Sequence, residues 1–109
     1  MIRIKIKPLS VNEAFRGRRF KTPKYKAFQK LVLLTLKPIP IPDGKICLKL
    51  RFGFSSKGSD IDNPVKQFTD CLSKKYSFND NRIYRLEISK EIVAKGHEFI
   101  EYQIEPYEK

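Results

Sequence analysis

The sequence is poor in several residue types on which common protein chemistries depend. Its 109 residues include two cysteines, one histidine and no tryptophan. Cys47 and Cys71 have neither a CxxC motif nor metal-site spacing, so neither a disulfide framework nor thiol redox chemistry is indicated. With His97 as the single histidine, a zinc site and a Ser-His-Asp triad have little support.

Long apolar runs are also missing. No stretch approaches the roughly 20 apolar residues that span a bilayer, and residues 1–8 alternate apolar with basic side chains instead of forming a signal-peptide core. We therefore expect a cytoplasmic protein with no membrane partner. The length predicts a single domain, residues 1–109, and because so small a domain buries a modest share of its surface, we expect a homodimer.

Acidic residues are few relative to basic ones. Twelve Asp and Glu face 23 Lys and Arg, which gives a formal net charge of +11. This excess favours a polyanionic partner, above all nucleic acid, although a solvated basic face is the alternative. The basic residues are concentrated in the first thirty positions, where Phe15 and Phe20 are available to stack on bases. The DNA contacts predicted in this segment are Arg16, Arg18, Arg19 and Lys21.

Two apolar periodicities follow one another along the chain. Alternation with a period of two predicts strands, at residues 2–6, 46–54, 84–89 and 100–104. Spacings of three and four predict two helices, one beginning at Pro23 with the apolar stripe Tyr25, Phe28, Leu31, Val32 and Leu36, the other over residues 64–75. Thr22 and Asn63 each precede a proline and are predicted N-caps. Residues 8–21 lack periodicity and are predicted to form a basic loop.

These elements predict an α+β fold. Their order is strand, helix, strand, helix, strand, strand, and the last two strands are predicted to form a hairpin near Lys95-Gly96. Each strand has one apolar and one polar face, so we expect both helices on one face of a four-stranded sheet. The other face is then left for solvent, a partner or DNA.

Asp60 and Asp62 are the strongest candidates for chemistry. In an extended segment, residues two apart point the same way, so both carboxylates would converge on one cation, and hard oxygen donors suit Mg²⁺. Asp80 is the third candidate ligand. The alternatives are helix capping for the first pair and an ordinary turn for Asp80. A helix of about 18 Å separates the two positions, so Asp80 must either return through its loop or complete the site of a second subunit.

Lys66 lies one helical turn beyond Asp62. It would either neutralise phosphate or form an i,i+4 pair with Asp70 that contributes little to stability.

Three segments together resemble the RusA family of crossover junction endodeoxyribonucleases. The segments are Asp60-Ile61-Asp62-Asn63 with Lys66, Asp70 and Leu72; Asn79-Asp80 with Ile83; and Lys7-Pro8-Leu9-Ser10-Val11-Asn12. The resemblance covers nearly the whole chain. The sequence departs from the family pattern at Asn79, where a second aspartate is frequent, and at Pro64.

The resemblance implies a homodimer that nicks four-way DNA junctions symmetrically with Mg²⁺ held by aspartates. The implied metal ligands and catalytic residues are Asp60, Asp62 and Asp80, with Lys66 as an auxiliary catalytic and DNA-contacting residue. Asn12 joins the expected DNA contacts. The alternatives are a non-catalytic DNA-binding module of the same fold and a less selective nuclease for branched or single-stranded DNA.

Overall fold

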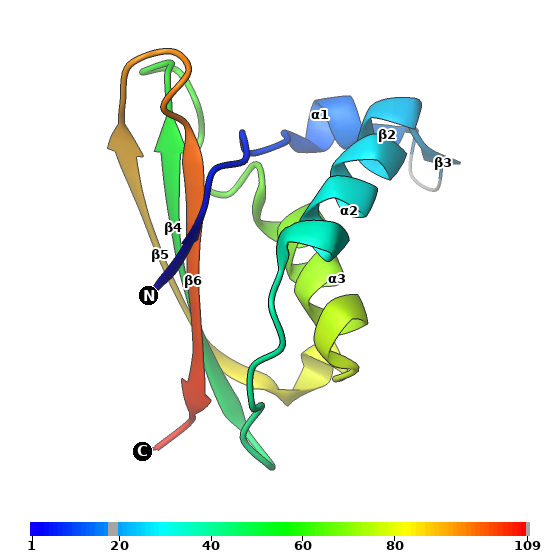
Figure 1. Cartoon of the computed structure of the whole chain (residues 1–109), viewed down its shortest axis with the longest axis vertical. Coiled ribbons are helices and arrows are strands. Elements are labelled where there is room, and N and C mark those ends of the chain that lie inside the picture. The colour runs from blue at the N-terminus through cyan, green and yellow to red at the C-terminus, as the bar shows by residue number, and fades with distance from the viewer. Residues whose placement is uncertain (18–19, 109) are drawn as a thin grey trace.

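The computed structural model of the chain describes residues 1–17 and 20–108. Two of the predicted DNA contacts, Arg18 and Arg19, lie outside the described residues. Four strands form one mixed sheet in the order β1-β6-β4-β5 (Figure 1). Their bounds are β1, Ile2–Ile4; β4, Ile46–Phe54; β5, Ile83–Ile92; and β6, Phe99–Pro106.

The central strand β4 determines the topology. It pairs with β5 in parallel and with β6 antiparallel, so these two strands lie on opposite sides of it. The predicted hairpin is therefore wrong. Residues 93–98 instead carry the chain past the end of β4, where the Val93 N–H donates to the Phe54 carbonyl over 2.7 Å. Alternation gives the face of a strand but does not identify its neighbours, which is why the pattern misled here.

Two helices cover one face of the sheet, as predicted (Figure 1). They are α2, Pro23–Thr35, and α3, Val65–Tyr76. Thr22 caps α2, because its hydroxyl accepts a hydrogen bond from the Tyr25 N–H. Leu31 was predicted to face the core but is 52% exposed. The buried stripe consists of residues at steps of three and four, namely Tyr25, Phe28, Val32 and Leu36, and Leu31 lies to one side of it.

The start of α3 differs from the prediction. Pro64, not Asn63, is the N-cap residue, and no side chain makes a capping hydrogen bond there. Proline has no side-chain oxygen that could accept from the first N–H groups of the helix, so α3 begins without a side-chain cap.

Residues 8–21 contain regular structure that the sequence did not indicate. They form a one-turn helix, α1 (Val11–Ala14), and a small hairpin of β2 (Phe15–Arg16) with β3 (Phe20–Lys21). The Ser10 hydroxyl caps α1 by accepting from the Glu13 N–H. Elements of two to four residues are too short to produce a periodic pattern. Throughout residues 1–17 and 20–108, no helix has the length and apolar character required to cross a membrane.

Candidate functional site

Asp60 and Asp62 lie in a turn between β4 and α3. The Asn63 N–H donates to the Asp60 carbonyl over 3.3 Å, and the Val65 N–H donates to the Asp62 carbonyl over 3.2 Å. The segment is therefore not extended, and the expectation that residues two apart share a direction does not apply to it. Both aspartates are exposed, two positions apart on one tight turn.

Neither carboxylate is used by the fold. The capping explanation requires an acidic side chain to accept from the first N–H groups of α3, but no side chain does so. Within residues 1–17 and 20–108, neither the Asp60 nor the Asp62 side chain takes part in a hydrogen bond or an ion pair. Two exposed carboxylates without internal partners remain available to a cation.

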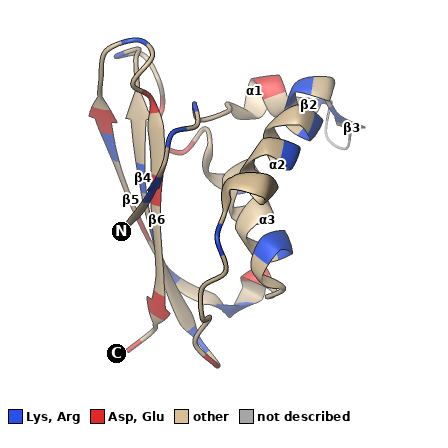
Figure 2. Cartoon of the chain, in the orientation of Figure 1, with Lys and Arg blue, Asp and Glu red and all other residues tan. Residues whose placement is uncertain are grey.

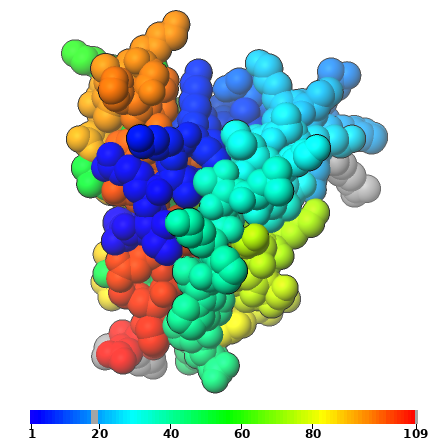
Figure 3. Space-filling model, in the orientation of Figure 1, coloured from blue at the N-terminus to red at the C-terminus, as the bar shows by residue number. Residues whose placement is uncertain are grey.

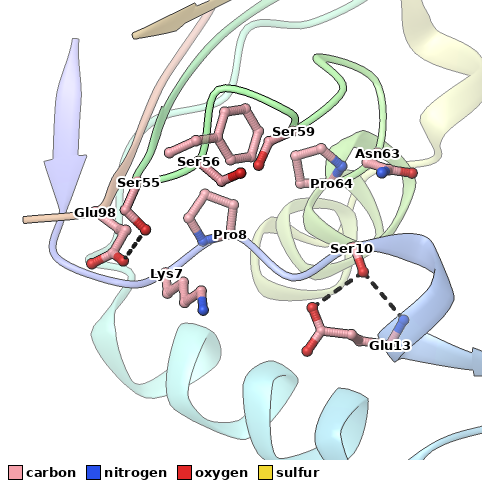
Figure 4. Close-up of a pocket in the computed structure, with 11 residues that line it drawn as sticks. Lys7, Pro8, Ser10, Glu13, Ser55, Ser56, Ser59, Asn63, Pro64 and Glu98 are labelled. Atoms are coloured by element: carbon pink, nitrogen blue, oxygen red, sulfur yellow. Dashed lines mark hydrogen bonds between the residues drawn. The ribbon is translucent and has the colours of Figure 1, made fainter. Parts of the chain in front are cut away.

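A cavity of about 200 Å³ adjoins this turn. As Figure 4 shows, Lys7, Pro8 and Ser10 line it from the N-terminal segment, and Asn63 and Pro64 line it from the beginning of α3. Two segments of the chain that were singled out separately in the sequence therefore meet in space. Their separation of about fifty residues gave no indication of this contact.

Glu98 closes the cavity on the sheet side. Its carboxylate accepts hydrogen bonds from the Ser55 hydroxyl and from the Gly96 N–H. Its own backbone N–H, the Ser55 hydroxyl and the Gly96 N–H lower its pKa below the usual glutamate value. Glu98 therefore stays ionised near neutral pH, and its hydrogen bond from the Gly96 N–H lies within the loop that joins β5 to β6.

Gln67 joins the two segments and was not among the site residues predicted from the sequence. Its side chain is fully buried, and the amide Nε2 donates to the carbonyls of Leu9, at 2.5 Å, and Asn63, at 2.7 Å. The amide Oε1 has no hydrogen-bond partner among the described residues. The only signal in the sequence was a polar residue beside the core position Phe68, which is common on any amphipathic helix.

Lys66 is exposed on the first turn of α3. In the described part of the chain no ion pair joins it to Asp70, whose carboxylate instead accepts from the Tyr25 hydroxyl over 3.4 Å. Burial, together with the nearby Asp70 carboxylate, raises the pKa of Tyr25. The alternative role of Lys66 as a partner of Asp70 therefore loses its support.

The strand β3 is linked to α3 through Tyr25 of α2. The Lys21 Nζ is 5.2 Å from the centre of the Tyr25 ring, and Tyr25 in turn contacts Asp70. Asn12, Arg16 and Lys21, the described members of the predicted DNA contacts outside α3, are all exposed.

Asp80 lies at the opposite end of α3. It belongs to the 3-10 turn η1, Asp80–Arg82, which Asn79 caps by accepting from the Asn81 N–H. The twelve residues of α3 separate it from the Asp60 turn, a helix length of about 18 Å. No group of three or more His, Cys, Asp or Glu side chains within the described ranges is placed to hold a metal ion. Within one copy, Asp60, Asp62 and Lys66 thus lie exposed on neighbouring turns, and Asp80 lies a helix length away.

The positive charge is distributed unevenly (Figure 2). On the uncovered face of the sheet, four cations form ion pairs with four glutamates: Arg3, Lys49, Arg51 and Arg85 with Glu87, Glu91, Glu101 and Glu105. These eight charges cancel, so the whole excess of +11 lies on the rest of the chain. Figure 3 shows the basic N-terminal segment, in blue, on the surface between the strands and α2. The cations outside these ion pairs include Arg16, Lys21 and Lys66, which are exposed. They also include Lys5 and Lys7, which line a cavity together with Arg3 and Glu91.

Comparisons of the chain with known protein families and with curated proteins give no match.

Proposed function

We propose that this protein is a Mg²⁺-dependent, structure-selective DNA endonuclease with a RusA-like fold, acting as a cytoplasmic homodimer on four-way junctions or other branched DNA. The observation that carries the proposal is the pair of exposed carboxylates at Asp60 and Asp62, which the fold does not use. They belong to a motif that resembles the sequence pattern of a nuclease family. They also lie next to the cavity where the N-terminal segment meets α3. The net charge of +11 supports a DNA partner.

The donor set fits magnesium. Mg²⁺ is commonly bound by one or two carboxylates, with water and substrate phosphate completing its coordination. Asp60 and Asp62 would hold it. When bound, Mg²⁺ would polarise the scissile phosphate and activate a water for attack. Lys66, exposed one turn further along α3, would contact the phosphate, and Arg16 and Lys21 would bind the DNA backbone.

The test is cleavage of a labelled synthetic four-way junction by the purified protein, with Mg²⁺ or with EDTA, beside a linear duplex of the same sequence. Paired nicks that require Mg²⁺ and spare the duplex are expected. Equal cleavage of junction, fork and single strand would support the less selective nuclease instead.

A second candidate is a non-catalytic DNA-binding module. The position of Asp80, a helix length from Asp60, and the presence of Asn79 before it favour this alternative. It predicts salt-sensitive junction binding with no cleavage in any divalent metal.

A further inference from the structure

Asp60 and Asp62 lie in a connection with few attachments to the rest of the fold. Residues 55–64 join β4 to α3, and their backbone hydrogen bonds are local. The Ser59 N–H donates to the Ser56 carbonyl over 3.2 Å, and the turn that follows is closed between near neighbours in the chain. Such bonds fix the shape of a turn but not its orientation relative to the sheet. The direction of the two carboxylates therefore also depends on contacts with distant residues.

Lys90 of β5 makes such a contact. Its Nζ donates to the Ser59 carbonyl over 2.7 Å, across 31 positions in the sequence. In the described part of the chain, this is the only hydrogen bond that reaches residues 57–62 from more than three residues away. The Ser59 carbonyl and the Asp60 N–H belong to one planar peptide unit. A bond to this carbonyl therefore also restrains the backbone of Asp60.

Lys90 is itself held on a well-anchored part of the sheet. In the parallel register it lies opposite Phe52, a fully buried core residue, so its side chain leaves the helix-covered face of the sheet. The Val93 N–H donates to the Phe54 carbonyl over 2.7 Å, which ties the ends of β5 and β4 together just before the connection begins. The lysine thus links the sheet to the turn from a fixed starting point.

No carboxylate competes for the Lys90 ammonium within residues 1–17 and 20–108. Its neighbour Glu91 pairs with Arg51, and none of the ion pairs includes Lys90. A hydrogen bond with a charged donor is roughly twice as strong as a neutral one. The charge of Lys90 therefore strengthens its bond to the Ser59 carbonyl, directly beside the candidate site.

We propose that Lys90 is a positioning residue for the candidate metal site, which holds the peptide between Ser59 and Asp60 so that Asp60 and Asp62 can bind one cation. This inference rests on the proposed function, and it assigns Lys90 no contact with the metal or with DNA. Residues that orient metal ligands from outside the coordination sphere contribute on the order of 10- to 100-fold to metal affinity or activity.

Mn²⁺ binding in the absence of DNA tests this role. Mn²⁺ accepts the same carboxylate and water ligands as Mg²⁺, and its free form is measured by electron paramagnetic resonance. Asp62→Asn should remove the binding and so identify the site. Lys90→Met should weaken binding at least about tenfold, and Lys90→Arg, which keeps a charged donor, should restore most of it. Unchanged or tighter binding in Lys90→Met would overturn the proposal.

The sign of the change separates positioning from a simple charge effect. Removal of a nearby positive charge should by itself favour the binding of a cation, so weaker binding in Lys90→Met points to the lost hydrogen bond. Lys57→Met is the matched control, because Lys57 is exposed in the same connection and its side chain makes no hydrogen bond among the described residues. Equal weakening in both variants would refute a specific role for Lys90. Lys90 is also exposed, so thermal melts should show every variant folded.

Cleavage and binding of a labelled four-way junction complete the test. Lys90→Met should raise the Mg²⁺ concentration for half-maximal cleavage at least about tenfold and leave the salt dependence of junction binding unchanged. A slope of log affinity against log salt lower by about 0.9 would make Lys90 a phosphate contact and overturn its positioning role. A native protein that neither binds Mn²⁺ nor cuts DNA would refute the proposed function. Native activity that Lys90→Met leaves intact would refute the role of Lys90 alone.

Discussion

At Asp62, a catalytic role can be distinguished from a role in folding by a single substitution. Its carboxylate has no partner within the described residues, so Asp62→Asn should leave the melting temperature unchanged and junction binding intact. Cleavage should fall by at least about 100-fold, since loss of even outer-shell metal contacts costs on the order of 10- to 100-fold. Steady-state cleavage rates, gel-shift binding and thermal melts of the same preparations provide the measurement.

Asp43→Asn is the matched control, because Asp43 is an exposed aspartate in a different turn. A large loss of stability in Asp62→Asn would assign the carboxylate to the fold and contradict its catalytic role.

Gln67 should matter for stability and for the shape of the site together. Gln67→Met keeps the side-chain volume but removes the donor shared by the carbonyls of Leu9 and Asn63. Leaving these two half-buried carbonyls without their donor should lower the free energy of unfolding by about 1–3 kcal/mol. Urea denaturation measures this loss, and Gln29→Met, at a half-buried position on α2, should change stability far less.

At this scale the sequence predicted part of the candidate site. Asp60, Asp62 and Lys66 could be singled out because carboxylates and a lysine at this spacing have a chemical rationale. The turn conformation could not be predicted, since it depends on hydrogen bonds to Asp60 and Asp62 that any residue type can make. Gln67 escaped because its partners are backbone carbonyls, one of which is far away in sequence.

The C-terminal end of α3 offers a test at the scale of one element. Ser77 has a left-handed backbone conformation, with φ of 54°, at the C-cap position. Because this conformation is unfavourable for residues with a Cβ, Ser77→Gly should raise the free energy of unfolding by about 0.5–1 kcal/mol. Ser73→Gly, within the same helix, should lower it by about 0.5–1 kcal/mol. Chemical denaturation of the two variants gives opposite signs if the cap geometry is correct.

Element types were largely predictable, and their arrangement was not. The alternation in β4 and the cap-plus-proline signal of α2 are local properties of the chain, so the pattern identified both. The position of β6 on the far side of β4 depends on which strand edges remain available after folding. Local periodicity contains no information about that choice.

The uneven charge of the whole molecule predicts which basic residues contact DNA. Replacing Arg16 and Lys21 with serine should reduce the slope of log affinity against log salt by about 1.8, since each phosphate contact contributes roughly 0.9. Lys49→Ser should leave the slope unchanged, because Lys49 is paired with Glu105 on the uncovered face of the sheet. Fluorescence anisotropy with a labelled junction across a salt series measures both. A change of slope in Lys49→Ser would place DNA on the open face.

The order β1-β6-β4-β5 also determines when this protein is able to fold during its synthesis. β6, which follows the other three strands in sequence, lies between β1 and β4, and it pairs Ile2 with Tyr102. Until residues 99–106 leave the ribosome, β1 lacks the one strand that it pairs with among the described residues, and β4 has one open edge. The sheet therefore depends on β6 to join β1 to β4, and the nascent protein must keep an apolar strand edge from aggregating until β6 has emerged.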